Sequence, residues 1–583
     1  MSDRRFALIG FHTNKFFSIL LNIGIFAFMK RVIIVIILIC AAFATFAQSN
    51  GAGVQMPENV VYFENNLNLG RIEGRSNNNA PTIFIYPDVR LDSASAKALV
   101  DEFDMKDVLV ENHIKVYVIN PVGAKYDNVK DFEGFKAVFN KARSGNLKVI
   151  GLGNGATFVN NALAPCDAAG HIAGILTING KPGKTPDKSW GVPAYVAGKN
   201  ADKVAKPYIS MNKANPEEEL LAVVVDKAVG ASIAEIFDRA WDEVFSRNFR
   251  FNNYQHTHYD GADYGEYGPY ELEPYTVYQR LGLKREIVVM EQKKGLPWLW
   301  YEYWPHELIE GAPDASVPVM VLLHGNTNDP RTQAETSGFL QVAGKERFFV
   351  VEMEWQGSRN YGAMGYDGVE RVIQLLLEKY PQLDPSRIYA QGLSAGAITA
   401  TALGICKSYL FAAVGGYGGG IYTGAKTGRF SNCHALWADA TQKRGFVEVA
   451  YCSIIGTADK VVPFYSPDSY KGNSYVTAWN TYQQLNGMEV TYDLDFTADP
   501  LLGLNLEDRK TIITNKGNGI KAETGYFYKG DVPLIKIVAV VDYGHWNFIP
   551  GAQMMWDYFK QFSRDPKTKK LVFKRPVEFI CPI

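Results

Sequence analysis

The feature that most constrains the fold is an alternation of short apolar runs with helix-length segments between residues 318 and 459. Strand-length apolar runs, such as the one that ends at Leu323 and the one over Val447–Ile455, are separated by periodic segments such as Gly368–Tyr380. Short continuous apolar runs are typical of strands buried on both faces, and their alternation with helices indicates βαβ units. This part of the chain is therefore predicted to form a mostly parallel sheet flanked by helices.

The same order of elements occurs a second time, between residues 79 and 205. Apolar runs and a glycine-containing turn appear in matching order. The sequence Ala-Asp-Lys-Val also occurs in both copies, at 201–204 and at 458–461. Matched order across several elements indicates an internal duplication. We therefore expect two tandem α/β domains of one architecture.

A stretch rich in Tyr, Gly and Pro, around Tyr259–Tyr275, has few apolar runs and separates the two copies. It sets the boundary between the predicted domains. The predicted organisation is a signal segment over 1–47, a first domain over 55–258, an aromatic linker over 259–284, a second domain over 285–565 and a C-terminal tail over 566–583.

The N-terminal segment has the parts of a secretory signal peptide. Lys30-Arg31 precedes the apolar run Val32–Ala44, and small residues follow it. Residues 29–47 form this signal if Met29 is the true start, with 1–28 as an extension; the alternative is a longer, uncleaved anchor. The run alone is too short to cross about 30 Å of hydrocarbon. We expect a secreted or periplasmic protein with no stable membrane span in its mature form.

Charge and cysteine content exclude several classes of function. The chain has 60 Lys and Arg against 61 Asp and Glu, which argues against a nucleic-acid surface because phosphate binding needs a concentrated basic excess. No C-x-x-C pair occurs, so the sequence supports neither a zinc site nor a redox motif. Cys406 and Cys433 are the nearest candidates for a disulfide in an exported protein, whereas Cys452 lies in an apolar run and is predicted to be a core residue.

Gly392-Leu393-Ser394-Ala395-Gly396 fits the G-x-S-x-G pattern, between a strand-like run and a helix-forming stretch. Small residues on either side of the serine allow a tight strand-to-helix turn that exposes its oxygen at the carboxyl end of the strand. The backbone N–H of Ala395 then opens the helix and can donate to a developing oxyanion. Ser394 is therefore the candidate nucleophile.

A serine nucleophile needs a base and a group that orients the base. His545 follows an apolar run over Leu534–Val541, and Asp459 follows the run over Val447–Ile455, so both are expected at the same sheet edge as Ser394. The alternative base, His434, follows a Gly-rich stretch. Asp542 is the alternative acid, but it stands only three positions from the base. The predicted triad is Ser394, Asp459 and His545.

The second oxyanion donor is expected in the loop after Leu323. Its His-Gly sequence places the backbone N–H of Asn326 near the Ser394 oxygen, with Thr327 as the alternative donor. His324 is interpreted as a structural residue that holds the loop.

The first copy lacks this chemistry. Gly153 stands at the nucleophile position, Tyr86-Pro87 is taken as the counterpart of the His-Gly element, and no histidine occurs between Asp202 and His256. The first domain is therefore predicted to be a degenerate, catalytically inactive copy.

Several segments of the second domain together resemble a known group of enzymes. They are LHGN at 323–326, DPSRIYAQGLSAGA at 384–397, GTADKVVP at 456–463, AWNTYQQLNG at 478–487 and GHW at 544–546. Over about 285–563 the chain resembles polyhydroxybutyrate-depolymerase-type and feruloyl esterase-like secreted esterases of the α/β-hydrolase fold. The chain departs from the group at the histidine, which Trp546 follows directly, and in the loop after Asn326.

The resemblance implies that the second domain has the α/β-hydrolase fold and hydrolyses carboxylic esters through an acyl-enzyme. Together with the internal duplication it predicts tandem α/β-hydrolase-like domains, of which the first is degenerate. No metal or organic cofactor is expected, and the partner is a small-molecule or polymer ester. Trp355, Tyr417 and Trp546 are the aromatic residues expected to contact it. The alternatives are an exported serine peptidase and a non-catalytic binding protein. The sequence carries no signal for the oligomeric state.

Overall fold

The structure is a computed structural model in which part of the chain is described. The predicted signal segment, most of the aromatic linker, Cys433, His434 and Thr327 lie outside that part. Among the described residues, no helix is both long enough and apolar enough to cross a membrane. The described residues are 56–66, 80–142, 144–186, 191–213, 221–228, 230–250, 277–291, 293–326, 328, 330–356, 364–421, 447–513 and 520–575.

The first sheet has seven strands in the order β1-β3-β2-β4-β5-β6-β7. β1 runs antiparallel to β3, and the other neighbours are parallel. The strands are β1 (Val60–Asn65), β2 (Ala80–Tyr86), β3 (Lys115–Ile119), β4 (Ser144–Leu152), β5 (Ile172–Ile178), β6 (Ala194–Ala197) and β7 (Val223–Asp226).

The second sheet has ten strands in the order β15-β16-β17-β14-β13-β12-β10-β11-β9-β8. The strands from β11 to β17 in this order are parallel, and β9-β8 and β16-β15 extend the two edges in antiparallel fashion. The strands are β8 (Leu283–Val289), β9 (Leu299–Pro305), β10 (Val317–Leu323), β11 (Phe349–Met353), β12 (Leu383–Leu393), β13 (Ala413–Tyr417), β14 (Ala450–Gly456), β15 (Glu507–Ile513), β16 (Lys521–Lys529) and β17 (Val532–Val540).

The two sheets share one topology. The order β9-β11-β10-β12-β13-β14-β17 repeats β1-β3-β2-β4-β5-β6-β7 strand for strand, including the single antiparallel neighbour at one edge. The protein therefore consists of tandem α/β-hydrolase-like sheets, and the predicted fold class is confirmed. The second sheet begins with one further strand, β8, which pairs with β9 in antiparallel fashion.

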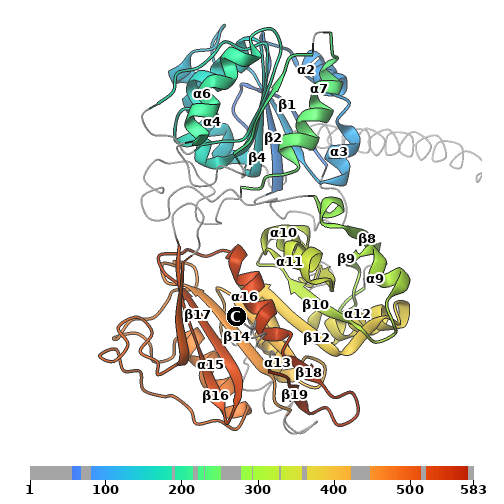
Figure 1. The fold of residues 1–583 in the computed structure, drawn as a ribbon, viewed down its shortest axis with the longest axis vertical. Coiled ribbons are helices and arrows are strands. Elements are labelled where there is room, and N and C mark those ends of the chain that lie inside the picture. The colour runs from blue at the N-terminus through green and yellow to red at the C-terminus, as the bar shows by residue number, and fades with distance from the viewer. Residues whose placement is uncertain are drawn as a thin grey trace, which may run out of the picture. The chain divides into compact units, whose positions relative to one another are not determined.

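Helices cover both faces of the first sheet. In Figure 1, α4 and α6 lie on one side of the strands, and α2, α3 and α7 lie on the other. Ala96, Leu109 and Phe237 from the latter three helices pack with Ile83 and Ile150 of the sheet in one core cluster. The helices are α2 (Ser93–Glu102), α3 (Lys106–Glu111), α4 (Asn128–Ala142), α5 (Asn154–Phe158), α6 (Ala201–Lys213) and α7 (Ile233–Ala240).

The second sheet is likewise covered by helices, with α16 drawn across β14 in Figure 1. Glu346 of α11 accepts hydrogen bonds from Gln553 and Trp556 of α16, which joins these two helices. The helices are α9 (His306–Gly311), α10 (Pro330–Thr336), α11 (Phe339–Glu346), α12 (Gly365–Lys379), α13 (Ala395–Cys406), α15 (Ser474–Leu485) and α16 (Ile549–Phe559).

Burial explains which strands could be predicted from the sequence. All residues of β10 (VPVMVLL) are buried, as expected for a central parallel strand with helices on both faces. β15 (EDRKTII) is exposed along almost its whole length and reads as polar. For this reason the sequence does not predict β15. It also does not predict β16, a strand of mixed polar and aromatic residues beside β15, or the edge strands β1 and β7, whose residues are only half-buried.

The predicted C-terminal tail begins inside a small hairpin. β18 (Phe562–Arg564) pairs with β19 (Leu571–Phe573) in antiparallel fashion. Arg564 is buried and donates to the carbonyls of Phe411 and Glu448, at 2.7 and 2.6 Å, which attaches the hairpin to the second sheet.

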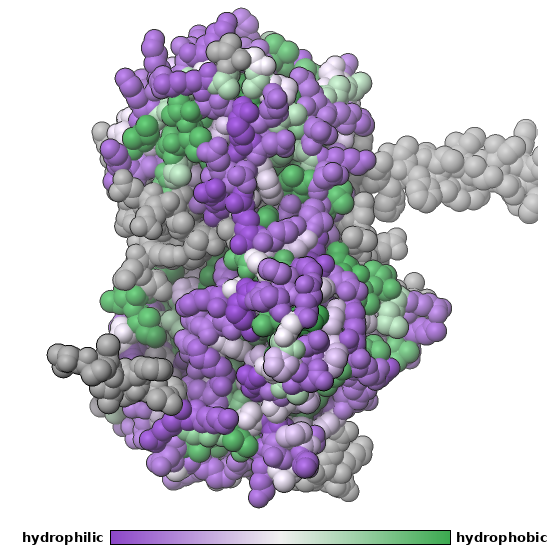
Figure 2. All heavy atoms as spheres, turned by 45° about the vertical axis from the view of Figure 1, so that its right-hand side comes forward, coloured by the Kyte–Doolittle hydropathy of each residue, from purple (hydrophilic) through white to green (hydrophobic). Residues whose placement is uncertain are grey.

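Figure 2 shows one face of the molecule, on which hydrophilic side chains predominate and apolar ones are scattered between them. This distribution is ordinary for a folded protein in water.

Alkylation of the Cys452 thiol tests whether the core of the second sheet is closely packed. Cys452 is fully buried in β14, and burial raises the pKa of its thiol to about 12. We expect iodoacetamide at pH 8 to leave it unmodified in the native protein and to alkylate it in denaturant, as measured by peptide mass spectrometry. The half-buried Cys166 and Cys406 are internal comparisons. Because the unfolded thiol loses its proton first, this group lowers the stability of the fold as the pH rises from about 9 toward 12. Rapid alkylation of native Cys452 would contradict the packing.

Candidate active site

Ser394 lies at a sharp turn between β12 and α13. Its φ and ψ are 53° and −116°, a strained conformation for a residue with a side chain. Its N–H donates to the carbonyl of Tyr417 at 2.8 Å. A side chain at Gly396 would overlap the carbonyl oxygen of Leu323, so the turn can pack this closely on β10 only with glycine there. This is the geometry that the G-x-S-x-G pattern predicts.

Asp459 and His545 lie together in a hydrogen-bonded pair. His545 Nδ1 is 2.6 Å from Asp459 Oδ2, and both side chains are buried. The other carboxylate oxygen of Asp459 accepts from the N–H groups of Val461 and Val462, each at 2.8 Å. These bonds fix the carboxylate, which in turn fixes the orientation of the imidazole.

The segment Tyr417-Gly418-Gly419, at the carboxyl end of β13, contacts both the serine and the acid–base pair. A Cβ on Gly418 would lie 3.0 Å from His545 Nδ1 and 3.2 Å from Asp459 Oδ2, and a Cβ on Gly419 would lie 2.7 Å from the carbonyl oxygen of Ser394. The three predicted triad residues therefore surround one short segment at one sheet edge.

Buried polar side chains hold the loop that follows β10 in place. His324 is fully buried, with Nε2 3.2 Å from Glu354 Oε1 and Nδ1 2.9 Å from the carbonyl of Gly325. Gln356 Nε2 donates to the same Gly325 carbonyl at 3.0 Å. His324 is thus a structural residue of this loop, in agreement with the sequence interpretation.

The two predicted oxyanion donors come from two different segments of the second domain. Ala395 is the first residue of α13 and is buried, and Asn326 is an exposed residue of the loop after β10. A Cβ on Gly325, next to Asn326, would lie 3.5 Å from the carbonyl oxygen of Leu393, which precedes Ser394. The loop is therefore adjacent to the turn that carries the serine.

The three predicted substrate-contacting aromatic residues are all buried. Trp355 donates from Nε1 to the carbonyl of His324 at 2.9 Å, so it supports the loop. Tyr417 ends β13, and Trp546 follows His545. Their contact with a substrate stays a prediction.

The first copy keeps the turn but not its chemistry. Gly153 has φ and ψ of 51° and −109°, close to the values of Ser394. Asn154, the counterpart of Ala395, donates its N–H to Asp88 Oδ1 at 2.7 Å. A Cβ at Gly153 would overlap the same carboxylate. The Asp88 carboxylate thus fills the space that a nucleophilic side chain would need, and it already accepts the N–H that would donate to an oxyanion.

The register of the first copy corrects one sequence assignment. Tyr86 pairs with Gly151 as Leu323 pairs with Gly392, so Pro87-Asp88 stands at the His-Gly position and Tyr86-Pro87 does not. The sequence alignment of the two copies was wrong by one residue, because apolar runs alone do not fix where a strand ends.

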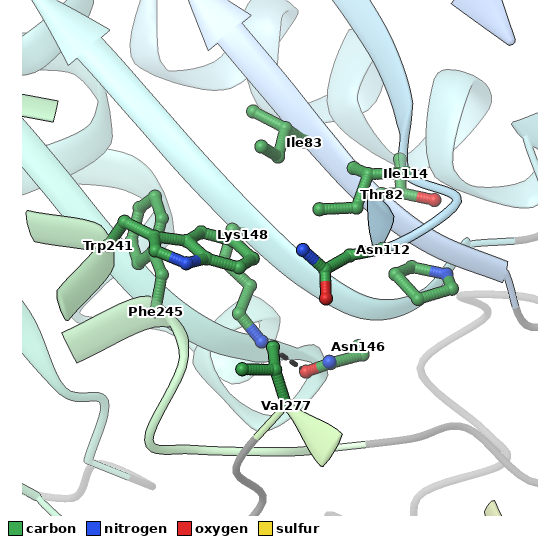
Figure 3. A pocket seen from close by; sticks show the side chains of 10 residues that line it. Thr82, Ile83, Asn112, Ile114, Asn146, Lys148, Trp241, Phe245 and Val277 are labelled. Atoms are coloured by element: carbon green, nitrogen blue, oxygen red, sulfur yellow. Dashed lines mark hydrogen bonds between the residues drawn. The ribbon is translucent and has the colours of Figure 1, made fainter. Parts of the chain in front are cut away.

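A pocket in the first domain lies away from this sheet edge. Figure 3 shows Lys148 of β4 directed toward Asn146, and its Nζ also donates to the carbonyl of Asn248 at 3.0 Å. Burial holds the pKa of Lys148 well below its usual value. The pocket is near the amino-terminal halves of the strands, whereas Gly153 follows their carboxyl ends. Its lining residues are Pro81, Thr82, Ile83, Asn112, Ile114, Asn146, Lys148, Trp241, Phe245 and Val277.

Within the described ranges, no group of three or more His, Cys, Asp or Glu side chains is arranged to hold a metal ion. The polar groups brought together in the second domain are instead a strained serine, an Asp–His pair and backbone N–H groups at a helix start. This set is suited to acyl transfer, because it offers a nucleophile, a base with an orienting carboxylate, and oxyanion donors.

No family model matches the chain, and no curated protein matches it. Solved structures with similarity include an acetyl xylan esterase from Aspergillus awamori, with 15% identity, a TM-score of 0.33, and coverage of 48% of this chain and 99% of that one. An S-formylglutathione hydrolase from Agrobacterium tumefaciens has 11% identity, a TM-score of 0.32, and coverage of 48% and 95%. A feruloyl esterase module from Clostridium thermocellum, complexed with sinapinate, has 14% identity, a TM-score of 0.28, and coverage of 48% and 86%. At these TM-scores the likeness identifies no family.

Sequence reasoning missed two parts of the site. Gly418 leaves no free space for a side chain beside the acid–base pair, but its sequence signal is only a glycine after a strand. Glu354 follows β11 and bonds with His324, which follows the neighbouring strand β10, and nothing near either residue in the sequence links them. The available signal was the second of two glutamates in the run Phe349–Trp355, directly after β11.

Gly418→Ala tests the packing around the acid–base pair. Gly418 has φ of +56°, and the added Cβ would press on His545 and Asp459. We expect labelling of Ser394 by a fluorophosphonate to slow by about tenfold or more, because a small displacement of the base disrupts proton transfer. The matched control is Gly530→Ala, with φ of +58° and no atom within 4 Å of its Cβ. Equal labelling rates in the two variants would contradict the arrangement.

Proposed function

We propose that the protein is a serine carboxylic-ester hydrolase that acts through an acyl-enzyme. The observation that carries the proposal is the buried 2.6 Å contact between His545 Nδ1 and Asp459 Oδ2, at the sheet edge where Ser394 occupies a strained turn. Strain of this kind persists where the surrounding structure enforces it, most often at functional sites.

In the proposed mechanism His545 takes the proton of the Ser394 hydroxyl as the serine oxygen attacks the ester carbonyl carbon. Asp459 holds the imidazole through Nδ1 and stabilises its charged form. The N–H groups of Ala395 and Asn326 donate to the oxyanion, and loss of one such donor costs about 10²- to 10³-fold in kcat in comparable sites. His545 then protonates the leaving alcohol, and water attacks the acyl-enzyme with the same base, which releases the acid and restores Ser394.

The substrate class and the location are parts of the same proposal. The sequence resemblance to polyhydroxybutyrate-depolymerase-type and feruloyl esterase-like enzymes supports esters of short hydroxy acids, of ferulate or of acetylated polysaccharide. The apolar run Val32–Ala44 after Lys30-Arg31 supports export. N-terminal sequencing of the mature protein from a secreting host is expected to show cleavage after Ala44 or Ala47; a retained, uncleaved segment would contradict export by a signal peptide.

Ser394→Ala tests the catalytic assignment. We expect the purified variant to lose at least about 10³-fold in hydrolysis of p-nitrophenyl acetate and butyrate and all fluorophosphonate labelling, because the hydroxyl that attacks the substrate is removed. Ser466→Ala, at an exposed loop position, is the control and should keep wild-type rates. Retention of most activity by Ser394→Ala would refute the assignment.

A substrate panel then separates the alternatives. Feruloyl esters, acetylated xylan and short polyhydroxyalkanoates are compared with peptide anilides under the same conditions. Preference for anilides would favour a peptidase, and a folded wild-type protein that resists fluorophosphonate would favour a binding protein.

A further inference from the structure

The short helix α10 is unusual because it is polar yet buried along its whole length. It begins soon after the loop that carries Asn326. Gln333, at its centre, is 1% exposed, so its side-chain amide must find partners inside the protein.

Gln333 finds these partners on two other elements. Its Nε2 donates to Gln391 Oε1 at 3.1 Å and to Asn547 Oδ1 at 3.2 Å, while its Oε1 accepts from Asn547 Nδ2, also at 3.2 Å. Gln333 and Asn547 thus form a reciprocal amide pair, and Gln391 extends it into a three-residue cluster.

The surrounding groups fix this amide cluster further. Asn547 Nδ2 also donates to Thr336 Oγ1 at 3.0 Å, and the Asn547 carbonyl accepts from the Tyr543 hydroxyl at 2.6 Å. Gln391 Nε2 donates to the carbonyl of Gly392 at 2.9 Å. Gln391 and Asn547 are both fully buried, so water does not compete for these bonds.

The two amide partners of Gln333 lie close in sequence to two residues of the triad. Gln391 lies in β12, three residues before Ser394, and Asn547 lies two residues after His545. The hydrogen bond between His545 and Asp459 joins the histidine loop to the loop after β14. The amide cluster joins the same histidine loop to β12, the strand that precedes the serine.

We propose that Gln333 is a positioning residue that sets the distance between Ser394 and His545 through Gln391 and Asn547. This inference rests on the proposed esterase function. The base must lie within hydrogen-bond reach of the nucleophile, and a displacement of about 1 Å can cost about 10²-fold in rate. Gln333 acts through its two partners and does not itself touch the reacting atoms.

The test compares Gln333→Leu with the double variant Gln333→Leu/Asn547→Leu. The single variant leaves Asn547 buried without its amide partner and is expected to lower both kcat, by about 10- to 100-fold, and Tm, with KM within about twofold. The double variant removes both members of the pair, so Tm is expected to recover while kcat stays low. Recovery of kcat together with Tm would show a purely stabilising role and overturn the proposal.

Gln483→Leu is the matched control. Gln483 is as buried as Gln333 and bonds with Thr491 through both its amide nitrogen and its oxygen, on α15 and the segment after it. Its loss should lower Tm and leave kcat unchanged. An equal fall in kcat would overturn a specific role for Gln333. If Gln333→Leu does not fold, Asn547→Ser serves in its place, with the same expected fall in kcat at unchanged KM.

Wild type and Ser394→Ala are assayed in parallel to separate the two proposals. An active wild type whose Gln333→Leu variant keeps its kcat overturns the positioning role alone. A wild type without ester hydrolysis or fluorophosphonate labelling overturns the esterase function and, with it, this inference.

Discussion

The parallel pairing of the central strands is the constraint on which the rest of the structure depends. Parallel strands need crossovers that place helices on both faces, so the central strands are mostly buried and apolar, and every parallel strand ends at the same sheet edge. In the second sheet this brings the residues after β10, β12, β13, β14 and β17 to one edge. Residues as distant in sequence as Ser394 and His545 are brought to that edge by the same rule.

The first copy shows that this frame does not by itself make a catalyst. Its turn at Gly153 has almost the backbone angles of Ser394, so the shape of the turn comes from the sheet and the crossover. Asp88 then occupies the space and the N–H donor that a nucleophile and an oxyanion would use. The functional difference between the copies therefore lies in a few side chains at one sheet edge.

Buried polar contacts refine the second copy. His324 with Glu354, Gly418 against the acid–base pair, and the amides of Gln333 and Asn547 each join segments that are far apart in the chain. A buried polar group that loses its partner costs about 1–3 kcal/mol, so such contacts hold loops in one arrangement. They make the edge of the sheet rigid where the proposed chemistry needs fixed distances.

The sequence alone determined the duplication, the central strands and the elbow at Ser394, because these depend on local periodicity and on glycine spacing. The sequence also predicts Asp459 and His545 at the same sheet edge as Ser394, and the tertiary structure adds the hydrogen bond between them. Only the tertiary structure decided the register that places Asp88 beside Gly153, the exposed edge strand β15 and its neighbour β16. Local sequence encodes which segments become strands and turns. Side chains from distant segments meet only when the sheet forms, so a local pattern can predict the sheet edge on which they lie but not the contacts that they make there.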